Sequence, residues 1–458
     1  MLQRFSILTL GCKVNQYETQ QIRQLLEGYG LAQVAVTERP ELVVINTCCV
    51  THTASAKSRH FIHQAQKHRP EAVVICGCLP TVHTDELKAA GENVHVVKDR
   101  RDLAATLHLL AAAQATTPDA QSSRHFDTPI KSDSDAKVKS KKDLCPPGEL
   151  PLLTSFAGQT RAFLKVQDGC DCHCSYCIIP TARPDVRFKI EDEILAEAAA
   201  LVAAGHKEIV LTGVHIGAYG YDTARRRDWP DKENPHLPNL LDKVAQVPNL
   251  ARIRLSSLDP TDVTPRLLDV FASHPNIMPH LHLSLQSGST AVLRRMNRPY
   301  TADDFRDKVA LIQSRLDRPA ITTDIIVGFP TETDAEFAET LALAREVTFA
   351  KMHVFAFSAR QGTPAAQMHP KVPPQIKKHR SQILRDLDSA LQSQYRTQFI
   401  GETAQVLIEG ADPVPTGRAE RYFEVQIPNA PQPLAANDLV AVKMEKDAPD
   451  GVRAALIS

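Results

Sequence analysis

The segment Cys170-Asp171-Cys172-His173-Cys174-Ser175-Tyr176-Cys177 decides how this sequence is interpreted. Within it, Cys170, Cys174 and Cys177 have the spacing Cx3CxxC, which places three thiols on one short loop. Thiolate ligands select iron–sulfur clusters, zinc or copper(I), and compact cysteine runs of this kind are typical of iron–sulfur proteins. A 4Fe–4S cluster held by three cysteines leaves one iron open to another ligand.

A structural zinc site is the alternative reading of this segment. Zinc in such sites takes four ligands, usually with a second pair of ligands some distance along the chain. Cys172 or His173 could complete a tetrahedron only with difficulty, because adjacent residues rarely reach one metal together. The spacing therefore favours a cluster and leaves zinc open.

The composition describes an ordinary globular chain of two or three domains. It has 458 residues, 43% of them hydrophobic and 23% charged, with a formal net charge of zero. A nucleic-acid surface would therefore have to be a local patch. The sequence has no run of about 18 apolar residues, so we do not expect a membrane span. Met1–Leu10 is interpreted as a strand and not as a signal peptide. Ten cysteines without a secretion signal indicate metal or redox use in a reducing compartment, so we expect a cytoplasmic protein without membrane attachment.

Residues 1–115 alternate short apolar strands with helical segments, which predicts a parallel sheet covered by helices. The expected strands are Phe5–Leu10, Leu42–Asn46, Val73–Cys76 and Val94–Val97, and the expected helices are Gln16–Tyr29, Thr53–His68, Asp85–Ala90 and Arg101–Ala113.

Three cysteines in this region each follow a different expected strand: Cys12, Cys48 and Cys78. Parallel strands end at one edge of a sheet, where ligands bind, so these thiols are predicted to converge on one site. The alternative is three unrelated buried thiols, since free cysteine often behaves as a small hydrophobe. We interpret Cys49 and Cys76 as structural.

Residues 116–155 are rich in Ser, Asp, Lys and Pro and predict a linker. Four lysines in it could contact phosphate, although a solvated linker explains them as well: Lys137, Lys139, Lys141 and Lys142. Cys145 is interpreted as incidental.

Residues 156–390 alternate strands and helices again and predict a partial barrel of six units. The expected strands are Arg161–Gln167, Glu208–Thr212, Arg252–Ser256, His280–Leu285, Ile321–Val327 and Lys351–Phe355; the expected helices include Glu191–Ala204, Thr264–Ser273, Ala302–Ser314 and Asp334–Val347. The cysteine run follows the first strand, and several later strand exits carry glycine or polar residues that suit a ligand pocket. An insertion at 223–235, which contains Trp229, is expected to be an exposed loop.

Residues 391–458, after a long polar helix over 371–398, predict a small all-β barrel with strands Glu402–Ile408, Glu420–Pro428 and Leu439–Met444. Basic side chains nearby permit RNA contact, and a packing role is the alternative: Arg396, Arg418 and Arg421.

Taken together, the domain order and the motifs resemble the radical S-adenosylmethionine (radical SAM) methylthiotransferases over nearly the whole chain. Further phrases that match are Leu211–Gly220 (LTGVHIGAYG), Arg254–Ser257 (RLSS), Leu283–Ser289 (LSLQSGS) and Thr323–Pro330 (TDIIVGFP). The resemblance implies one 4Fe–4S cluster on Cys170, Cys174 and Cys177, with S-adenosylmethionine on its open iron. It implies a second 4Fe–4S cluster on Cys12, Cys48 and Cys78, and a C-terminal TRAM-like RNA-binding barrel.

Thr9–Glu18 (TLGCKVNQYE) and Val214–Tyr219 (VHIGAY) resemble the branch that acts on N6-threonylcarbamoyladenosine beside the anticodon of tRNA. The isopentenyladenosine branch more often reads Gly-Cys-Gln-Met-Asn at the first position, and the branch that modifies an aspartate of a ribosomal protein reads Pro-Lys-Asn after that cysteine. Two residues depart from the family pattern: Cys172 adds a thiol inside the cluster loop, and Pro184 replaces a glycine after it.

The chemistry that the resemblance implies is radical addition of sulfur to C2 of the adenine, followed by methylation of that sulfur. No acid–base side chain can activate such a C–H bond, so no catalytic acid or base is expected. By loop position, five residues are our candidates for binding S-adenosylmethionine: Thr212, Gly213, Ser256, Gln286 and Asp324. We expect a monomer served by a flavodoxin- or ferredoxin-type electron donor. The alternative from another class is a non-catalytic, metal-containing RNA-binding protein.

Overall fold

The computed structural model describes residues 2–83, 87, 91–112, 150–231, 233–430 and 433–457. Contacts divide the chain into two compact units, Met1–Cys49 with Thr53–Leu152 and Val50–His52 with Leu153–Ser458. The expected helix 85–90, apart from residue 87, lies outside the described residues, as do Cys145 and the four linker lysines. At the C-terminal end of the expected linker, Leu153 is fully buried and its N–H donates to Glu197 Oε1 over 2.8 Å.

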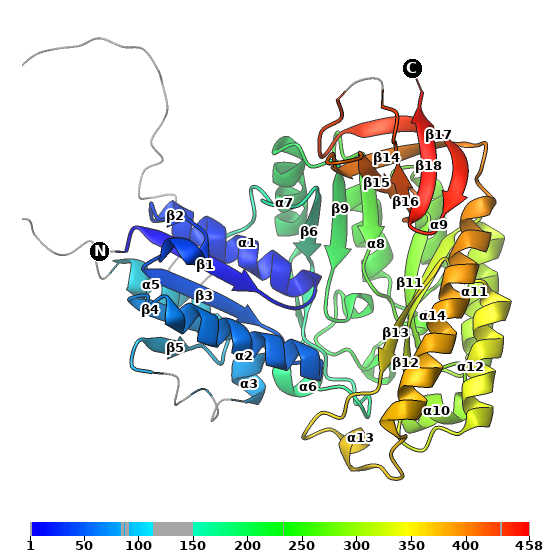
Figure 1. Ribbon diagram of the computed structural model, residues 1–458, viewed down its shortest axis with the longest axis horizontal. Coiled ribbons are helices and arrows are strands. Elements are labelled where there is room, and N and C mark those ends of the chain that lie inside the picture. The colour runs from blue at the N-terminus through cyan, green and yellow to red at the C-terminus, as the bar shows by residue number, and fades with distance from the viewer. Residues whose placement is uncertain are drawn as a thin grey trace, which may run out of the picture. The chain divides into compact units, whose positions relative to one another are not determined.

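The first unit contains the predicted parallel sheet, with a short edge strand, β2, that was not predicted; the strand order is β2-β1-β3-β4-β5 (Figure 1). Its strands are β1 (Arg4–Thr9), β2 (Ala32–Gln33), β3 (Leu42–Thr47), β4 (Ala72–Gly77) and β5 (Val94–Val96), and its helices are α1 (Lys13–Gly28), α2 (His52–Lys67), α3 (Leu79–Val82) and α5 (Arg101–Ala112). The central strands β3 and β4 are buried along their whole length because helices cover both faces of such a sheet. Leu42 pairs with Ala72 and Thr47 with Gly77, so these two strands end level with each other.

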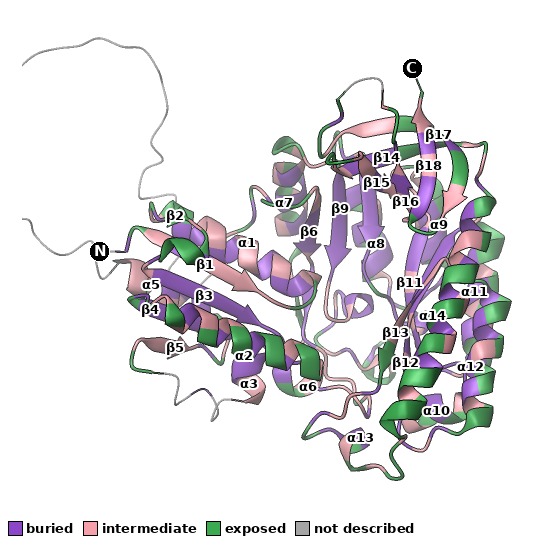
Figure 2. Cartoon of the chain, viewed as in Figure 1, coloured by how far each residue is buried: buried purple, intermediate pink, exposed green. Residues whose placement is uncertain are grey.

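The second unit contains two three-stranded parallel sheets that together form the predicted partial barrel. One has the order β10-β9-β6 and the other β11-β12-β13, and a bridge between Leu258 and Leu283 links them. The strands are β6 (Arg161–Lys165), β9 (Glu208–Thr212), β10 (Arg252–Leu255), β11 (His280–Gln286), β12 (Ala320–Val327) and β13 (Lys351–Ala356). The helices that follow them are α7 (Glu191–Ala203), α8 (His236–Ala245), α9 (Pro265–Ser273), α10 (Thr290–Arg295), α11 (Ala302–Arg315) and α12 (Asp334–Val347). Figure 2 shows β9 buried along its whole length.

The same unit ends in helix α14 (Pro374–Thr397) and a closed barrel in the order β14-β15-β16-β18-β17. The strands are β14 (Thr403–Gly410), β15 (Thr416–Ala419), β16 (Glu424–Gln426), β17 (Leu439–Ala448) and β18 (Gly451–Leu456). The barrel is confirmed, but our three-strand prediction missed β15 and β18. In β15 a side chain at Gly417 would lie 2.2 Å from the carbonyl oxygen of Leu407, so this glycine marks close strand packing and not a turn.

Two buried arginines join this barrel to the core of the second unit. Arg252 donates to the carbonyl oxygens of Arg418 and Gln405, and Arg254 donates to those of Ala419 and Glu420. The buried carboxylate of Glu208 compensates both guanidinium charges. The basic residues considered for RNA contact also have partners within the protein, as the packing alternative expects: Arg396 with Asp447, Arg418 with Glu409, and Arg421 with Asp317.

Candidate functional site

The cysteine run lies between strand β7 (Gln167–Asp168) and helix α6 (Ile179–Ala182), and its base is pinned to the segment that follows it. Gly169 has a φ of +78°, and a Cβ there would lie 1.9 Å from the carbonyl oxygen of Asp185, so only glycine fits. The Cys170 N–H donates to the carbonyl oxygen of Arg183 over 3.1 Å. Pro184, which replaces the family's usual glycine, follows Arg183 directly and is exposed.

A cavity of approximately 350 Å³ opens beside the run, between the ends of the barrel strands. The four cysteines of the run all line it, together with residues at or beyond the ends of β9, β10 and β11; among these are His215, Arg226, Ser257, Asp259, Asp262, Gln286 and Arg298. A pocket of this size with convergent polar groups suits a small polar cofactor.

The insertion at 223–235 is only in part the exposed loop that we expected, because some of its described residues, among them Ala224 and Trp229, pack against the cysteine run. Trp229 is only 8% exposed and stacks on Tyr221, with ring centroids 4.6 Å apart. Asp171 accepts hydrogen bonds of 2.7 Å from Thr223 Oγ1 and from the Ala224 N–H. The expectation failed because the arginines suggested a solvated segment, whereas Arg226 lies over the Trp229 ring and pairs with the buried Asp262.

Arg298 is the main electrostatic partner of the cysteine run. Its Nη1 donates to Cys174 Sγ over 3.2 Å, and its Nη2 pairs with Asp259 Oδ2. Burial raises the pKa of the Cys174 thiol, although the Arg298 charge opposes the shift, and burial raises the pKa of Cys177 to about 12. Binding of a cationic centre would displace the protons of these two thiols, and with Cys170 on the same loop the set of three sulfur ligands fits an iron–sulfur cluster.

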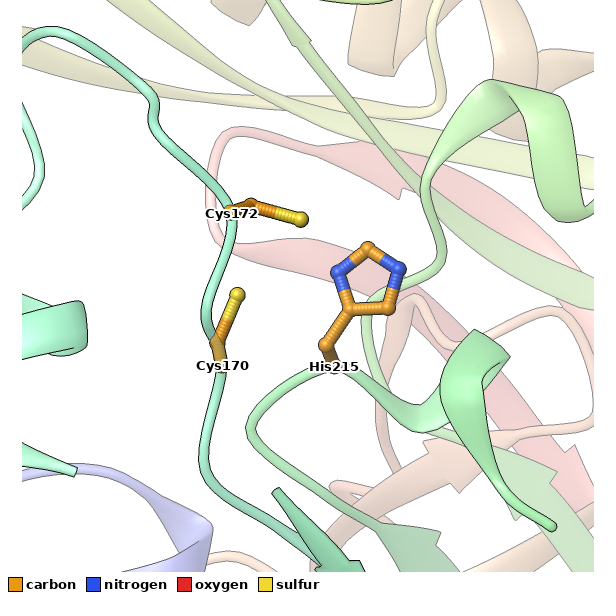
Figure 3. Close-up of side chains that lie close together, drawn as sticks. All are labelled: Cys170, Cys172 and His215. Atoms are coloured by element: carbon orange, nitrogen blue, oxygen red, sulfur yellow. The ribbon is translucent and has the colours of Figure 1, made fainter. Parts of the chain in front are cut away.

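Cys170 and Cys172 approach the same point, and His215 joins them (Figure 3). The ligand atoms of the three residues lie within 4.8 Å of one another. Cys172 Sγ also donates to the carbonyl oxygen of Ala224 over 3.2 Å, which ties the extra thiol to the covering insertion. Sequence reasoning missed His215 as a member of the site, although it lies inside the phrase Leu211–Gly220 that carries the family resemblance.

The residues proposed for S-adenosylmethionine fall in different places. Gln286, with a φ of +67°, lines the cavity. Thr212, Gly213, Ser256 and Asp324 lie outside its lining, which includes Ser257 immediately after Ser256. Sequence reasoning also missed Arg298 and Asp259, because neither belongs to a motif whose spacing points to the cysteines.

The structure brings Cys12, Cys48 and Cys78 to the same edge of the first unit's sheet. The Cβ that a side chain at Gly11 would carry lies 3.1 Å from the Cβ of Cys48, and the Cys78 N–H donates to the carbonyl oxygen of Thr47. Cys48 and Cys78 are buried and Cys12 is exposed. Arg100 Nη2 donates to Cys78 Sγ over 3.4 Å. Three thiols at one edge beside a cation fit a second cluster.

The other two described cysteines of this unit are buried away from solvent. Cys76 belongs to the hydrophobic core, and Cys49 donates to the carbonyl oxygen of Cys78 over 3.4 Å. Their structural role remains our interpretation.

Comparison with known proteins gives two family matches and near full-length relatives. Residues 164–344 match the radical SAM superfamily, and residues 4–98 match a family described as uncharacterized protein family UPF0004. A threonylcarbamoyladenosine tRNA methylthiotransferase of Chlamydia pneumoniae is 34% identical over 98% of this chain and 97% of its own length. One of Bacillus subtilis is 36% identical over 88% and 84%. A tRNA-2-methylthio-N(6)-dimethylallyladenosine synthase of Geobacillus kaustophilus is 32% identical over 89% and 73%.

Among solved structures, the radical S-adenosylmethionine methyltransferase TsrM from Kitasatospora setae aligns with a TM-score of 0.55, 15% identity, and coverage of 80% of this chain and 74% of its own. That likeness supports the fold alone. Among the described residues, no helix is both long enough and apolar enough to cross a membrane.

Proposed function

The chain belongs to the radical SAM tRNA methylthiotransferases, and from this premise we propose that it adds a methylthio group to C2 of N6-threonylcarbamoyladenosine beside the anticodon of tRNA. The observation that carries the choice of substrate is the likeness to a threonylcarbamoyladenosine enzyme over 98% of the chain. Relatives that act on dimethylallyladenosine are nearly as similar, so that nucleoside is the second candidate. An aspartate of a ribosomal protein is the third.

The family uses S-adenosylmethionine and two 4Fe–4S clusters. We assign one cluster to Cys170, Cys174 and Cys177, and the other to Cys12, Cys48 and Cys78. When bound, these cofactors supply the radical and sulfur chemistry that an unactivated C–H bond requires.

The residues around Cys170, Cys174 and Cys177 position the cofactors and exclude water. Arg298 places a positive charge beside Cys174 and is itself oriented by the buried Asp259. The insertion around Trp229 packs against Cys170 and Cys172 and holds the loop through Asp171. No described side chain of the cavity is assigned a proton-transfer role. An electron donor of the flavodoxin or ferredoxin type and a monomeric state complete the proposal.

The test uses the reconstituted enzyme and two anticodon stem-loop RNAs that differ only in the substituent on one adenine. Mass spectrometry of the nucleosides should show methylthiolation of the threonylcarbamoyl RNA and little of the dimethylallyl RNA. The opposite preference would replace the proposed substrate with the second candidate. Activity on neither RNA, together with thiomethylation of a ribosomal-protein peptide, would establish the third.

A further inference from the structure

The proposed function uses neither Cys172 nor His215, although both line the cavity beside the cysteine run. Ligand atoms of Cys170, Cys172 and His215 lie within 4.8 Å of one another, and the group includes neither Cys174 nor Cys177. Figure 3 shows the two sulfur atoms and one nitrogen of the imidazole turned toward one another. Two thiols and an imidazole gathered at one point are a ligand set for a single soft metal ion. We call these three residues the Cys-Cys-His group.

His215 is oriented as a metal-binding histidine would be. Its backbone N–H donates to Gln167 Oε1 over 2.7 Å, which fixes the chain just after β9. The ring nitrogen that faces the thiols is Nδ1, next to the ring carbon that joins the side chain (Figure 3). The other nitrogen, Nε2, lies 3.7 Å from Oδ2 of Asp262, a carboxylate that Arg226 also holds. A carboxylate on this side stabilises a proton on Nε2 and leaves the lone pair of Nδ1 toward the sulfurs.

The two thiols are held in place from the opposite side. Cys170 and Cys172 both pack against the hydrophobic side chains around Trp229, and Cys172 Sγ donates to the carbonyl oxygen of Ala224. Residues two positions apart project to the same side of an extended segment. The sequence alone offered a mononuclear site only ligands from this one short run, whereas the fold adds His215 from a distant part of the chain.

We propose that Cys170, Cys172 and His215 bind one zinc ion when the loop carries no iron–sulfur cluster, with the fourth position open to water. Zinc accepts thiolate and imidazole ligands together in one tetrahedral site, and the two thiols release their protons to solvent on binding. Because Cys170 belongs to both ligand sets, zinc and the cluster exclude each other. Cys172, by which the loop departs from the family pattern, thus makes cluster loading sensitive to zinc. The inference is independent of which nucleoside is the substrate.

The experiment uses the full chain with Cys12, Cys48 and Cys78 replaced by alanine, so that the other cysteine group cannot bind the metal. This parent chain is prepared without iron and titrated with zinc in competition with a coloured chelator, which gives the affinity and the number of ions bound. Cobalt(II) in place of zinc reports thiolate ligands by its charge-transfer absorption. None of these measurements requires catalytic turnover.

The parent chain should bind one zinc ion. Cys172→Ala and His215→Gln should each bind it at least about tenfold more weakly, because loss of a ligand costs no less than loss of a residue that orients one. Cys174→Ala and Cys177→Ala should bind zinc as the parent does, since only the cluster uses their thiols. His173→Gln is the matched control, an exposed histidine of the same run, and should also bind as the parent does.

Cluster loading gives the second measurement. Zinc added before iron and sulfide should prevent cluster formation in the parent chain but not in Cys172→Ala. Without zinc, both chains should take up about four irons, which shows that the variant is folded. Zinc binding that needs Cys174 or Cys177 but not Cys172 or His215 would overturn the site in favour of the cluster thiols. No zinc binding by a parent chain that takes up iron would also overturn it, and equal blocking by zinc in both chains would refute the competition.

Discussion

The two cysteine groups of this chain are positioned by different means. Cys12, Cys48 and Cys78 follow three neighbouring parallel strands, so the register of the sheet alone brings them to one edge. Cys170, Cys174 and Cys177 lie on one loop, and side chains far along the chain hold that loop in place. Asp171 is bound by Thr223, 52 residues later, and Cys174 by Arg298, 124 residues later. A strand-end site can be inferred from local patterns, whereas a loop site depends on contacts that spacing does not reveal.

The largest effect on activity should come from replacing one cysteine in each group, because the two groups are expected to have different roles. Cys170→Ala is expected to abolish cleavage of S-adenosylmethionine, and Cys12→Ala is expected to spare cleavage but block methylthiolation. Each variant should hold about four irons per chain instead of about eight, because each loses one 4Fe–4S cluster. Iron analysis and chromatography of 5′-deoxyadenosine measure these outcomes, with Cys145→Ser as the control. Full methylthiolation by Cys12→Ala would contradict the two-cluster assignment.

A smaller effect, on the rate of iron release, should come from the contacts that hold the loop Cys170–Cys177. Asp171→Ala removes both hydrogen bonds to the covering insertion and the pairing with Arg225. We expect a chelator to extract the cluster on Cys170, Cys174 and Cys177 about tenfold faster than from the unsubstituted chain. This is the size of effect typical of residues that orient metal ligands. The measurement is iron release in a Cys12→Ala background, which retains only the cluster on Cys170, Cys174 and Cys177. The control is Asp222→Ala, which changes an exposed aspartate directly before the insertion and should release iron at the background rate.

Arg298→Gln tests whether this loop also tunes its cofactor. Loss of the positive charge and of the N–H donated to Cys174 Sγ should make the cluster harder to reduce, because both stabilise the added electron. For a one-electron couple, a hydrogen bond of about 1 kcal/mol corresponds to roughly 40 mV. A redox titration followed by electron paramagnetic resonance would show this lowering, and the exposed Arg294→Gln on helix α10 would not. Equal potentials in both variants would reduce Arg298 to a packing role.

The same contrast explains what could be predicted from sequence. Periodicity located Glu208–Thr212 and Asp334–Val347 with the bounds that the structure has, because each is a regular apolar or amphipathic segment between clear breaks. The strand β15 was missed because it contains Gly417, and glycine occurs both in turns and where backbones pack closely.

Residues that join the site only through long-range tertiary contacts could not be predicted from sequence. The strand-exit rule found Gln286 in the cavity, but it gave no sign of Arg298 or of the buried Trp229, which act through tertiary contacts. Cys172 was noticed from sequence, yet its proximity to His215 depends on how the chain folds back after β9. Local pattern therefore predicts elements and strand ends, and the covering contacts of a loop need the structure.

The smallest effect should come from the opposite edge of the first unit's sheet. Glu41 precedes β3 and accepts hydrogen bonds from the Arg4 guanidinium and from the N–H groups of Gln3 and Arg4. Burial acts to raise its pKa, but these bonds prevail and lower the pKa of Glu41 to about 2. Since the pKa is depressed in the folded state, this stabilisation is present above the unfolded value, about 4.3, and is lost as the pH falls toward 2.

Glu41→Gln should therefore weaken the sheet by about 1 kcal/mol, since the pair is partly exposed. Hydrogen exchange in β1 and β3 should quicken about fivefold relative to the wild type, by the same factor at pH 7 and pH 5, because both values lie above the unfolded pKa. Iron content should not change, because Cys12, Cys48 and Cys78 lie beyond the other ends of the strands. A fall in bound iron would show that the cysteine edge depends on more than the register of the sheet, which would weaken the contrast between the two cysteine groups.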